Sequence, residues 1–164
     1  MSKTQENLMA AFAGESQANR KYLAYGKQAE KEGFPQVAKL FRAAAEAETI
    51  HAHAHLRAAG KIGDTMANLK DAIGGETYEF TKMYPDMIKD AEAEDKRAVK
   101  KYMECVNAVE EVHAKLYQKA LDAQGKTAAV DYYICSACGY THEGPHSDKC
   151  PICNAAASAS YKAD

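Results

Sequence analysis

The stretch EEVH at residues 110–113 decides the fold, because a glutamate and a histidine stand three positions apart in a segment rich in helix-forming residues. Residues with this spacing lie on one face of a helix, so the pair offers a carboxylate and an imidazole to the same point. The same pattern occurs earlier, as ETIH at residues 48–51. Glu15 and Glu76, each preceded by glycine, stand 33 and 34 residues upstream of the two motifs. The chain therefore repeats itself, and two helix pairs about a pseudo-twofold axis would bring four glutamates and two histidines together.

Turn-forming residues divide the first 124 residues into four segments with helical periodicity. Residues 33–35 separate the first from the second, residues 60–63 end the second, and residues 92–96 separate the third from the fourth. In these segments, mainly apolar residues recur at alternating steps of four and three. This spacing predicts that one stripe along each helix faces inward. Pro85 falls in the third segment, where we expect it to kink the helix or to end a hydrogen-bonded turn. The fold class is therefore mainly α, with four helices in a bundle.

Glutamates stand on the apolar stripe of every predicted helix, where an isolated carboxylate would be very costly to bury. They are Glu15, Glu48, Glu76, Glu79 and Glu110. Solvated faces of helices rich in Glu and Lys are the alternative explanation. Two Glu-x-x-His units, each placed after an inward glutamate, favour a metal site instead, and oxygen and imidazole donors without thiolate suit iron or manganese. This set of residues is typical of ferritin-like di-iron and di-manganese bundles.

Four of the five cysteines lie within nineteen residues, as two Cys-x-x-Cys pairs. The pairs are Cys135 with Cys138 and Cys150 with Cys153. In a reducing compartment such a cluster is far more often a metal site than a set of disulfides. Four thiolates with this spacing predict a tetrahedral site for one iron or one zinc. Asn154 stands where a glycine would usually follow the second pair, and we expect it to adopt the left-handed backbone conformation that Asn tolerates.

A change of composition after Gly125 divides the chain. Residues 1–124 form the predicted bundle, residues 125–132 a linker, and residues 133–164 a small metal-binding module. The formal net charge of −2 gives no reason to expect nucleic acid or an anionic membrane as a partner. No run approaches 18 apolar residues, and the first residues lack the apolar core of a signal peptide. We therefore expect a cytoplasmic protein.

With both sites in view, the sequence resembles the rubrerythrin family over essentially its whole length. The matching stretches are AGESQA at residues 13–18, ETIH at 48–51, GETYE at 75–79, EEVH at 110–113 and the two cysteine pairs. The order, with a bundle first and a rubredoxin-like module last, is also that of the family. The resemblance implies two irons bound by Glu15, Glu48, Glu76, Glu79, Glu110, His51 and His113. It also implies a third iron bound by the four cysteines, where zinc remains an alternative.

The activity that the resemblance implies is a peroxidase that reduces hydrogen peroxide to water. Electrons would come from a nicotinamide cofactor through an external reductase or rubredoxin, and would pass from the four-cysteine iron to the di-iron site. Glu79 adds negative charge that favours ferric iron, and the resemblance implies that one iron moves between Glu79 and His51. Tyr22 and Tyr84 match family tyrosines that hydrogen-bond ligating glutamates, and core packing is the alternative explanation for both.

We further expect a homodimer or higher oligomer, with electrons crossing between subunits. The fourth helix carries the chain roughly 17 Å beyond His113, and nothing in the sequence asks the module to fold back onto its own helix. A head-to-tail pair would place each module near the partner's bundle. His53 and His55 are expected at the surface or in an interface, and His142 and His146 are expected to be exposed to solvent.

Two other functions are compatible with the same residues. A ferritin-like bundle can oxidise and store ferrous iron, although storage requires no module that delivers electrons. Alternatively, the module holds zinc and the chain is a metal-binding or stress-signalling protein without turnover. Ferric four-cysteine iron is red and zinc is colourless, so an absorption spectrum separates these possibilities.

Overall fold

The computed structural model describes residues 2–145 and 148–163. The chain divides into two compact units, Met1–Gly63 and Asp64–Asp164. The first is a helical hairpin, and the second combines helices with a small β-sheet. His146 lies outside the described residues.

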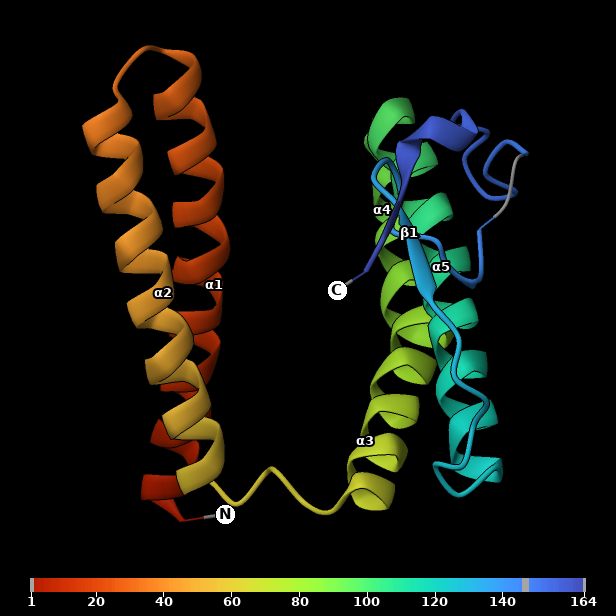
Figure 1. Cartoon of the computed structure of the whole chain (residues 1–164), viewed down its shortest axis with the longest axis horizontal. Helices are drawn as coiled ribbons and strands as arrows, with labels where there is room; N and C mark the ends of the chain where they lie inside the picture. The colour runs from red at the N-terminus through yellow and green to blue at the C-terminus, as the bar shows by residue number, and fades with distance from the viewer. Residues whose placement is uncertain (1, 146–147, 164) are drawn as a thin grey trace. The chain divides into compact units, whose positions relative to one another are not determined.

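The first unit consists of α1 (Lys3–Lys31) and α2 (Pro35–Ala58), which run antiparallel (Figure 1). Small buried residues let the two helices approach closely. Ala38 and Ala45 are almost fully buried, and a side chain at Gly26 would meet the Ala38 carbonyl at 3.5 Å. Asn19 joins the helices by donating to the Ala45 carbonyl at 2.7 Å and to the Thr49 hydroxyl at 2.8 Å. These contacts hold one face of α1 against the helix that carries the ETIH motif.

The ends of this hairpin are tied by the residues that begin α1. The Ser2 hydroxyl accepts from the Gln5 backbone N–H at 3.3 Å, as an N-cap does. The Gln5 side chain donates to the Ala59 carbonyl at 2.6 Å, beyond the end of α2. Because that carbonyl lies beyond the last turn of α2, this bond connects the start of one helix to the end of the other.

The second unit begins with a helical run that changes its winding in the middle. The run consists of α3 (Thr65–Tyr78), the π-helical turn η1 (Glu79–Met83) and α4 (Tyr84–Ala93). Pro85 has no N–H to continue the usual pattern, and the Tyr84 N–H bonds to the Glu79 carbonyl five residues back. The effect expected of Pro85 is therefore seen as a widened turn at the helix junction. The unit continues with α5 (Arg97–Asp122), which carries the EEVH motif.

The module is a three-stranded antiparallel sheet with the strand order β2-β1-β3. Its strands are β1 (Tyr132–Cys135), β2 (Thr141–Glu143) and β3 (Ser160–Lys162), and a 3₁₀ turn, η2 (Ala157–Ala159), precedes the last. In β1, Ile134 pairs with Thr141 on one side and with Tyr161 on the other. The prediction of a mainly α protein with a small C-terminal module is confirmed.

The module packs onto α5 of its own chain (Figure 1). Val109 on α5 is only 1% exposed and lies in one cluster with three of the four cysteines. On the surface, the Lys119 ammonium pairs with the Glu143 carboxylate at 2.6 Å. This contact was not predicted, because nothing in the sequence asks the module to fold back onto its own helix. Val109 supplies an apolar contact to the module as well as to the helices, and the sequence pattern does not distinguish these two uses.

Among the described residues, no helix is both long and apolar enough to cross a membrane.

Candidate metal centres

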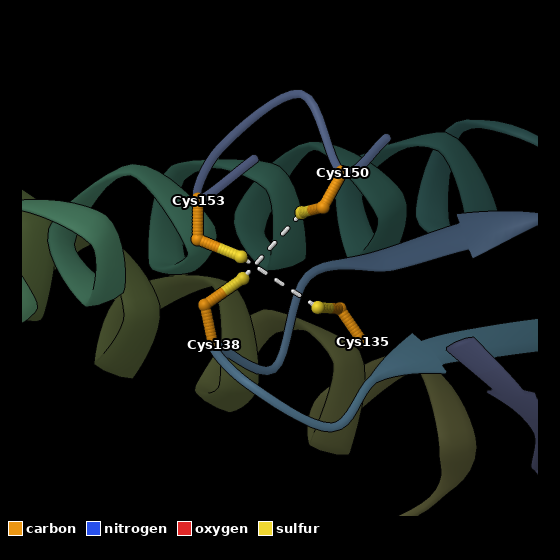
Figure 2. A group of neighbouring side chains, drawn as sticks. All are labelled: Cys135, Cys138, Cys150 and Cys153. Atoms are coloured by element: carbon orange, nitrogen blue, oxygen red, sulfur yellow. Dashed lines mark hydrogen bonds between the residues drawn. The ribbon is translucent and has the colours of Figure 1, made fainter. Parts of the chain in front are cut away.

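The four cysteines of the module converge on one point from two loops (Figure 2). The Sγ atoms of Cys135 and Cys153 are 3.8 Å apart, and those of Cys138 and Cys150 are 3.7 Å apart. Metal–sulfur bonds of about 2.3 Å at a tetrahedral centre separate the sulfurs by about 3.8 Å. The sulfur positions therefore fit one tetrahedral iron or zinc ion.

Backbone conformation and N–H groups around the cysteines support this geometry. The residues that follow the two pairs, Gly139 and Asn154, have φ angles of 84° and 61°, which confirms the left-handed conformation expected for Asn154. Burial raises the pKa of the Cys135 thiol, but the N–H groups of Ala137 and Cys138 outweigh burial and lower that pKa to about 7. Burial raises the pKa of Cys153. At least one thiolate is thus stabilised before a metal binds.

A cluster of two carboxylates and one imidazole lies in the second unit, where α3 packs against α5. Its members are Glu76, Glu110 and His113, whose ligand atoms all lie within 4.8 Å of one another. Oε2 of Glu110 is 2.8 Å from Nδ1 of His113, and Oε2 of Glu76 is 3.9 Å from the same nitrogen. The side chains of Glu110 and His113 are 12% and 26% exposed. Both oxygens thus face the Nδ1 side of the imidazole, where a metal would bind all three.

The electrostatics of this cluster are those of a site built for positive charge. Burial, reinforced by the charge of Glu110, raises the pKa of Glu76 to about 7 despite the opposing effect of His113. Burial and the charge of Glu110 also raise the pKa of Glu79. Carboxylates held this close repel one another without a cation, so a divalent metal would relieve the repulsion.

A matching cluster lies in the first unit, on the facing sides of α1 and α2. It consists of Glu15, Glu48 and His51, with Oε2 of Glu48 at 2.9 Å from Nδ1 of His51. Hydrogen bonds with His51 and Glu15 hold the pKa of Glu48 below its usual range. Each unit therefore carries one Glu-Glu-His cluster, and the internal repeat of the sequence is also a repeat of the site.

The remaining predicted residues lie near these clusters in different ways. Glu79 begins the π turn, and its pKa responds to the charges of Glu110 and His113. Burial and the charges of Glu110 and Glu79 raise the pKa of Tyr84, which places its ring near both carboxylates. Tyr22 packs against Phe41 with ring centroids 6.1 Å apart.

Two residues that sequence reasoning missed lie in β2. Thr141 hydrogen-bonds His113, with 3.1 Å between Oγ1 and Nε2. His142 is 9% exposed and stacks on Tyr133 and Tyr140, so its expected exposure is wrong. No sequence signal marks Thr141, because its partner is 28 residues away and the contact forms only when the module docks. His53 is exposed, as expected, whereas His55 is half-buried.

A cavity of about 460 Å³ opens on the Glu-Glu-His cluster of the second unit. Glu76, His113 and Thr141 line it together with apolar side chains from α3 and α5, among them Leu69 and Leu116. A small uncharged molecule would find an apolar path to two of the three candidate ligands.

Comparison with known proteins agrees with both kinds of site. The family model for rubrerythrin matches residues 6–121, and the model for the rubredoxin-like domain of rubrerythrin matches residues 133–159. The chain is 35% identical to nigerythrin of Nitratidesulfovibrio vulgaris, with 92% of this chain and 81% of nigerythrin covered. It is 36% identical to rubrerythrin-1 of Clostridium acetobutylicum, with 92% and 89% covered. A solved structure of partially reduced nigerythrin has a TM-score of 0.59 and 31% identity, with 99% and 88% covered.

The Glu-Glu-His clusters on helices and the four-cysteine module together define a class of protein. This class is the di-iron oxidoreductases that carry a rubredoxin-like iron site. The chain belongs to the rubrerythrin family. Its cofactors are those of the family, a di-iron carboxylate site and one iron at the four cysteines.

Proposed function

We propose that this protein is a peroxidase that reduces hydrogen peroxide to water, with electrons relayed through the four-cysteine iron. The observation that carries this proposal is the contact between the two kinds of site within the second unit. The four-cysteine module packs on α5, and Thr141 of the module touches the candidate ligand His113. Iron storage would not require an electron-transfer site at that position, and a structural zinc would not require contact with a ligand of the other centre.

The residues proposed to hold the two irons are the two Glu-Glu-His clusters together with Glu79. When bound, two ferrous ions supply peroxide with two electrons, and two protons complete the conversion to two waters. Glu79, at the start of the π turn, provides a carboxylate beyond the symmetric set, and neutral His51 is the proposed alternative ligand after reduction. The carboxylates of both clusters would balance the charge of the metal pair.

Three features of the chain support peroxide as the substrate. The cavity at Glu76 and His113 admits a small polar molecule through apolar walls. The raised pKa of Tyr84 keeps its hydroxyl protonated at neutral pH, so that it can donate a hydrogen bond toward Glu79 or Glu110. Glu76 can hold a proton near neutral pH before metal binds, because burial raises its pKa to about 7.

The partners and location proposed for the protein follow from the sequence. An external reductase or rubredoxin donates electrons, the protein works in the cytoplasm, and the active assembly is a homodimer or higher oligomer. Exposed apolar side chains on α2 support assembly, because Leu40 and Ile50 are 68% and 61% exposed. Covering such side chains on association would stabilise an assembly.

The test is consumption of peroxide by iron-loaded protein supplied with a nicotinamide cofactor, a reductase and rubredoxin. We expect steady consumption by the wild type, and none above background for Glu110→Ala. Lys101→Ala, an exposed change on the same helix, should match the wild type. Ferrous iron oxidised and retained without peroxide turnover would favour iron storage, and a colourless protein with zinc at the cysteines would favour a non-catalytic role.

A further inference from the structure

The two ring nitrogens of His113 have different partners, and this difference fixes their roles. Nδ1 faces Glu110 at 2.8 Å and Glu76 at 3.9 Å, whereas Nε2 lies 3.1 Å from Oγ1 of Thr141. A metal held by the two carboxylates would take Nδ1 as its third ligand. Nε2 would then keep its hydrogen and donate it to the Thr141 hydroxyl, as metal-bound histidines usually donate their second N–H.

The Thr141 hydroxyl has a second partner on the side of the cysteines. Oγ1 donates to the Gly139 carbonyl at 3.1 Å, and Gly139 directly follows Cys138. Because the hydroxyl accepts from His113 and has one hydrogen of its own, both hydrogen bonds have a defined direction. The pairing of Thr141 with Ile134 across β1 and β2 holds the hydroxyl in this place.

We infer that Thr141 is a positioning residue that couples the two metal centres of one chain, by joining the His113 imidazole to the carbonyl of Gly139, the residue that follows Cys138. With iron bound, which rests on the proposed function, one electron would pass from ferrous iron at the four cysteines to ferric iron held by Glu76, Glu110 and His113. The first iron would be oxidised to ferric as the second is reduced to ferrous. The two hydrogen bonds of Thr141 stay unchanged during this transfer, and no proton moves along them. An external one-electron donor protein then reduces the four-cysteine iron again.

Two other contacts between α5 and the module lack a hydrogen-bonded connection to a candidate ligand. The Lys119–Glu143 ion pair is at the surface and touches no candidate ligand. Val109 offers a competing route, because it precedes Glu110 and its Cγ1 lies 3.9 Å from where a side chain at Gly139 would begin. That route crosses a van der Waals gap, whereas the route through Thr141 crosses two hydrogen bonds and then follows the covalent chain from Gly139 to Cys138.

The experiment follows an electron without peroxide, so that it does not depend on the peroxidase proposal. A radiolytic pulse reduces the four-cysteine iron of oxidised, iron-loaded protein, and the return of its red absorption reports the onward transfer of the electron. The variants are Thr141→Val, which keeps the shape but removes the hydroxyl, and Thr141→Ser, which restores the hydroxyl. Lys119→Gln is the matched control, because it weakens docking of the module without touching the bridge. Iron content and the ferric absorption spectrum are compared before the pulse.

We expect the concentration-independent return of the red absorption to slow about 10- to 100-fold in Thr141→Val, the range seen when partners of metal ligands are removed. Thr141→Ser should recover most of the rate, and Lys119→Gln should stay within about twofold of the wild type. A Thr141→Val rate within twofold of the wild type would overturn the inference and favour Val109. An equal loss in Lys119→Gln would also overturn it, since docking alone would then set the rate.

A second measurement uses the wild type and applies even if Thr141→Val does not bind iron. In diferrous protein labelled with ¹⁵N-histidine, the Nε2–H proton of His113 should exchange slowly with solvent because Thr141 accepts it. Exchange as fast as that of the exposed His53 would show that the bond to Thr141 is absent. Failure of peroxide turnover with a slow-exchanging proton and fast electron transfer would instead contradict the proposed function alone.

Discussion

Glu79 differs from the other inward glutamates because it begins a π turn and has no counterpart in the repeat of the first unit. Single π turns inside helices are frequent at functional sites, where they reposition a side chain without changing the flanking helices. Its carboxylate senses the charges of Glu110 and His113, so it lies near the cluster of the second unit. We therefore propose that Glu79 serves redox cycling more than metal retention.

Glu79→Ala should retain two metals at the bundle and lose most peroxide turnover, by about 10- to 100-fold. The six other proposed ligands remain, but the variant lacks the extra carboxylate that we propose favours ferric iron. Metal analysis and reductase-driven peroxide consumption check this, with the exposed Glu111→Ala as the control. Wild-type turnover in Glu79→Ala would contradict the role.

Glu76 gives the metal-free protein a defined pH dependence. Its pKa is about 7 in the folded chain and close to the ordinary value of about 4.3 in the unfolded chain. The folded state thus binds more protons between these values, and the stability contributed by protonated Glu76 is lost as the pH rises through about 7. Metal-free Glu76→Gln should therefore resist urea better than wild type near pH 8 and equally near pH 5.

Urea midpoints of the two metal-free proteins check this pH dependence, with the exposed Glu111→Gln as the control. Iron loading should reverse the order at high pH, because iron holds Glu76 ionised. If metal-free Glu76→Gln were less stable than the wild type at high pH, ionised Glu76 would not destabilise the folded protein at that pH.

At the residue scale, the sequence predicts ligands better than it predicts their partners. Each Glu-x-x-His unit brings its two side chains together because the helix repeat alone dictates it, and the structure has them 2.8 and 2.9 Å apart. The contact of Thr141 depends on the docking of the module, and the burial of His142 depends on the pairing of β1 with β2, so local spacing carries no information about either residue. The Glu-x-x-His contacts are predictable because they form within one helix, whereas the contacts of Thr141 and His142 form between two elements.

At the element scale, the contact of the module with α5 depends on Val109. This residue is only 1% exposed and packs among Cys135, Cys138 and Cys150. Val109→Ala removes two methyl groups from this contact and should cost about 2 kcal/mol of unfolding free energy. Chemical denaturation measures the loss, and Val99→Ala, at an exposed position of the same helix, is the control.

Limited proteolysis shows which part of the chain Val109→Ala destabilises. Cleavage in residues 125–131 should become faster, while the four-cysteine iron keeps its absorption spectrum. Unchanged stability and unchanged cleavage would show that the module is held on α5 by other contacts.

The helical elements themselves were predictable because their signals are local. The turn at residues 32–34, the buried stripes and the caps follow from glycine, proline and serine at defined positions. The π turn was not predicted, because Pro85 indicates only that the hydrogen-bond pattern changes nearby. Whether the helix then ends, kinks or forms a wider turn depends on the packing of α3 and α4 against α5, which no local sequence pattern encodes.

At the scale of the whole molecule, the docking of the module changes the expected route of electrons. The separation that suggested transfer into a partner subunit is absent, since the module lies on its own α5. Mixing Cys138→Ser with Glu110→Ala chains tests this. In every mixed assembly, the intact module then lies on the chain whose own cluster is broken, so we expect no return of reductase-driven peroxide turnover after proven subunit exchange.

Each of the two variants requires its own control before mixing. Cys138→Ser should lose the four-cysteine metal and keep its helices by circular dichroism, because the bundle sites lie on other elements. Glu110→Ala should keep the red absorption of the module. Turnover that returns on mixing would show that modules serve the partner's cluster.

We propose that one chain joins a peroxide-reducing di-iron site to the iron of its module. Rapid mixing of fully reduced protein with excess peroxide, with both iron absorptions recorded, tests this proposal. We expect the di-iron site to oxidise first, and the red absorption of the module to return afterwards at a rate independent of peroxide concentration. A module that reddens first, in proportion to peroxide, or peroxide that is not consumed by the reduced protein, would contradict it.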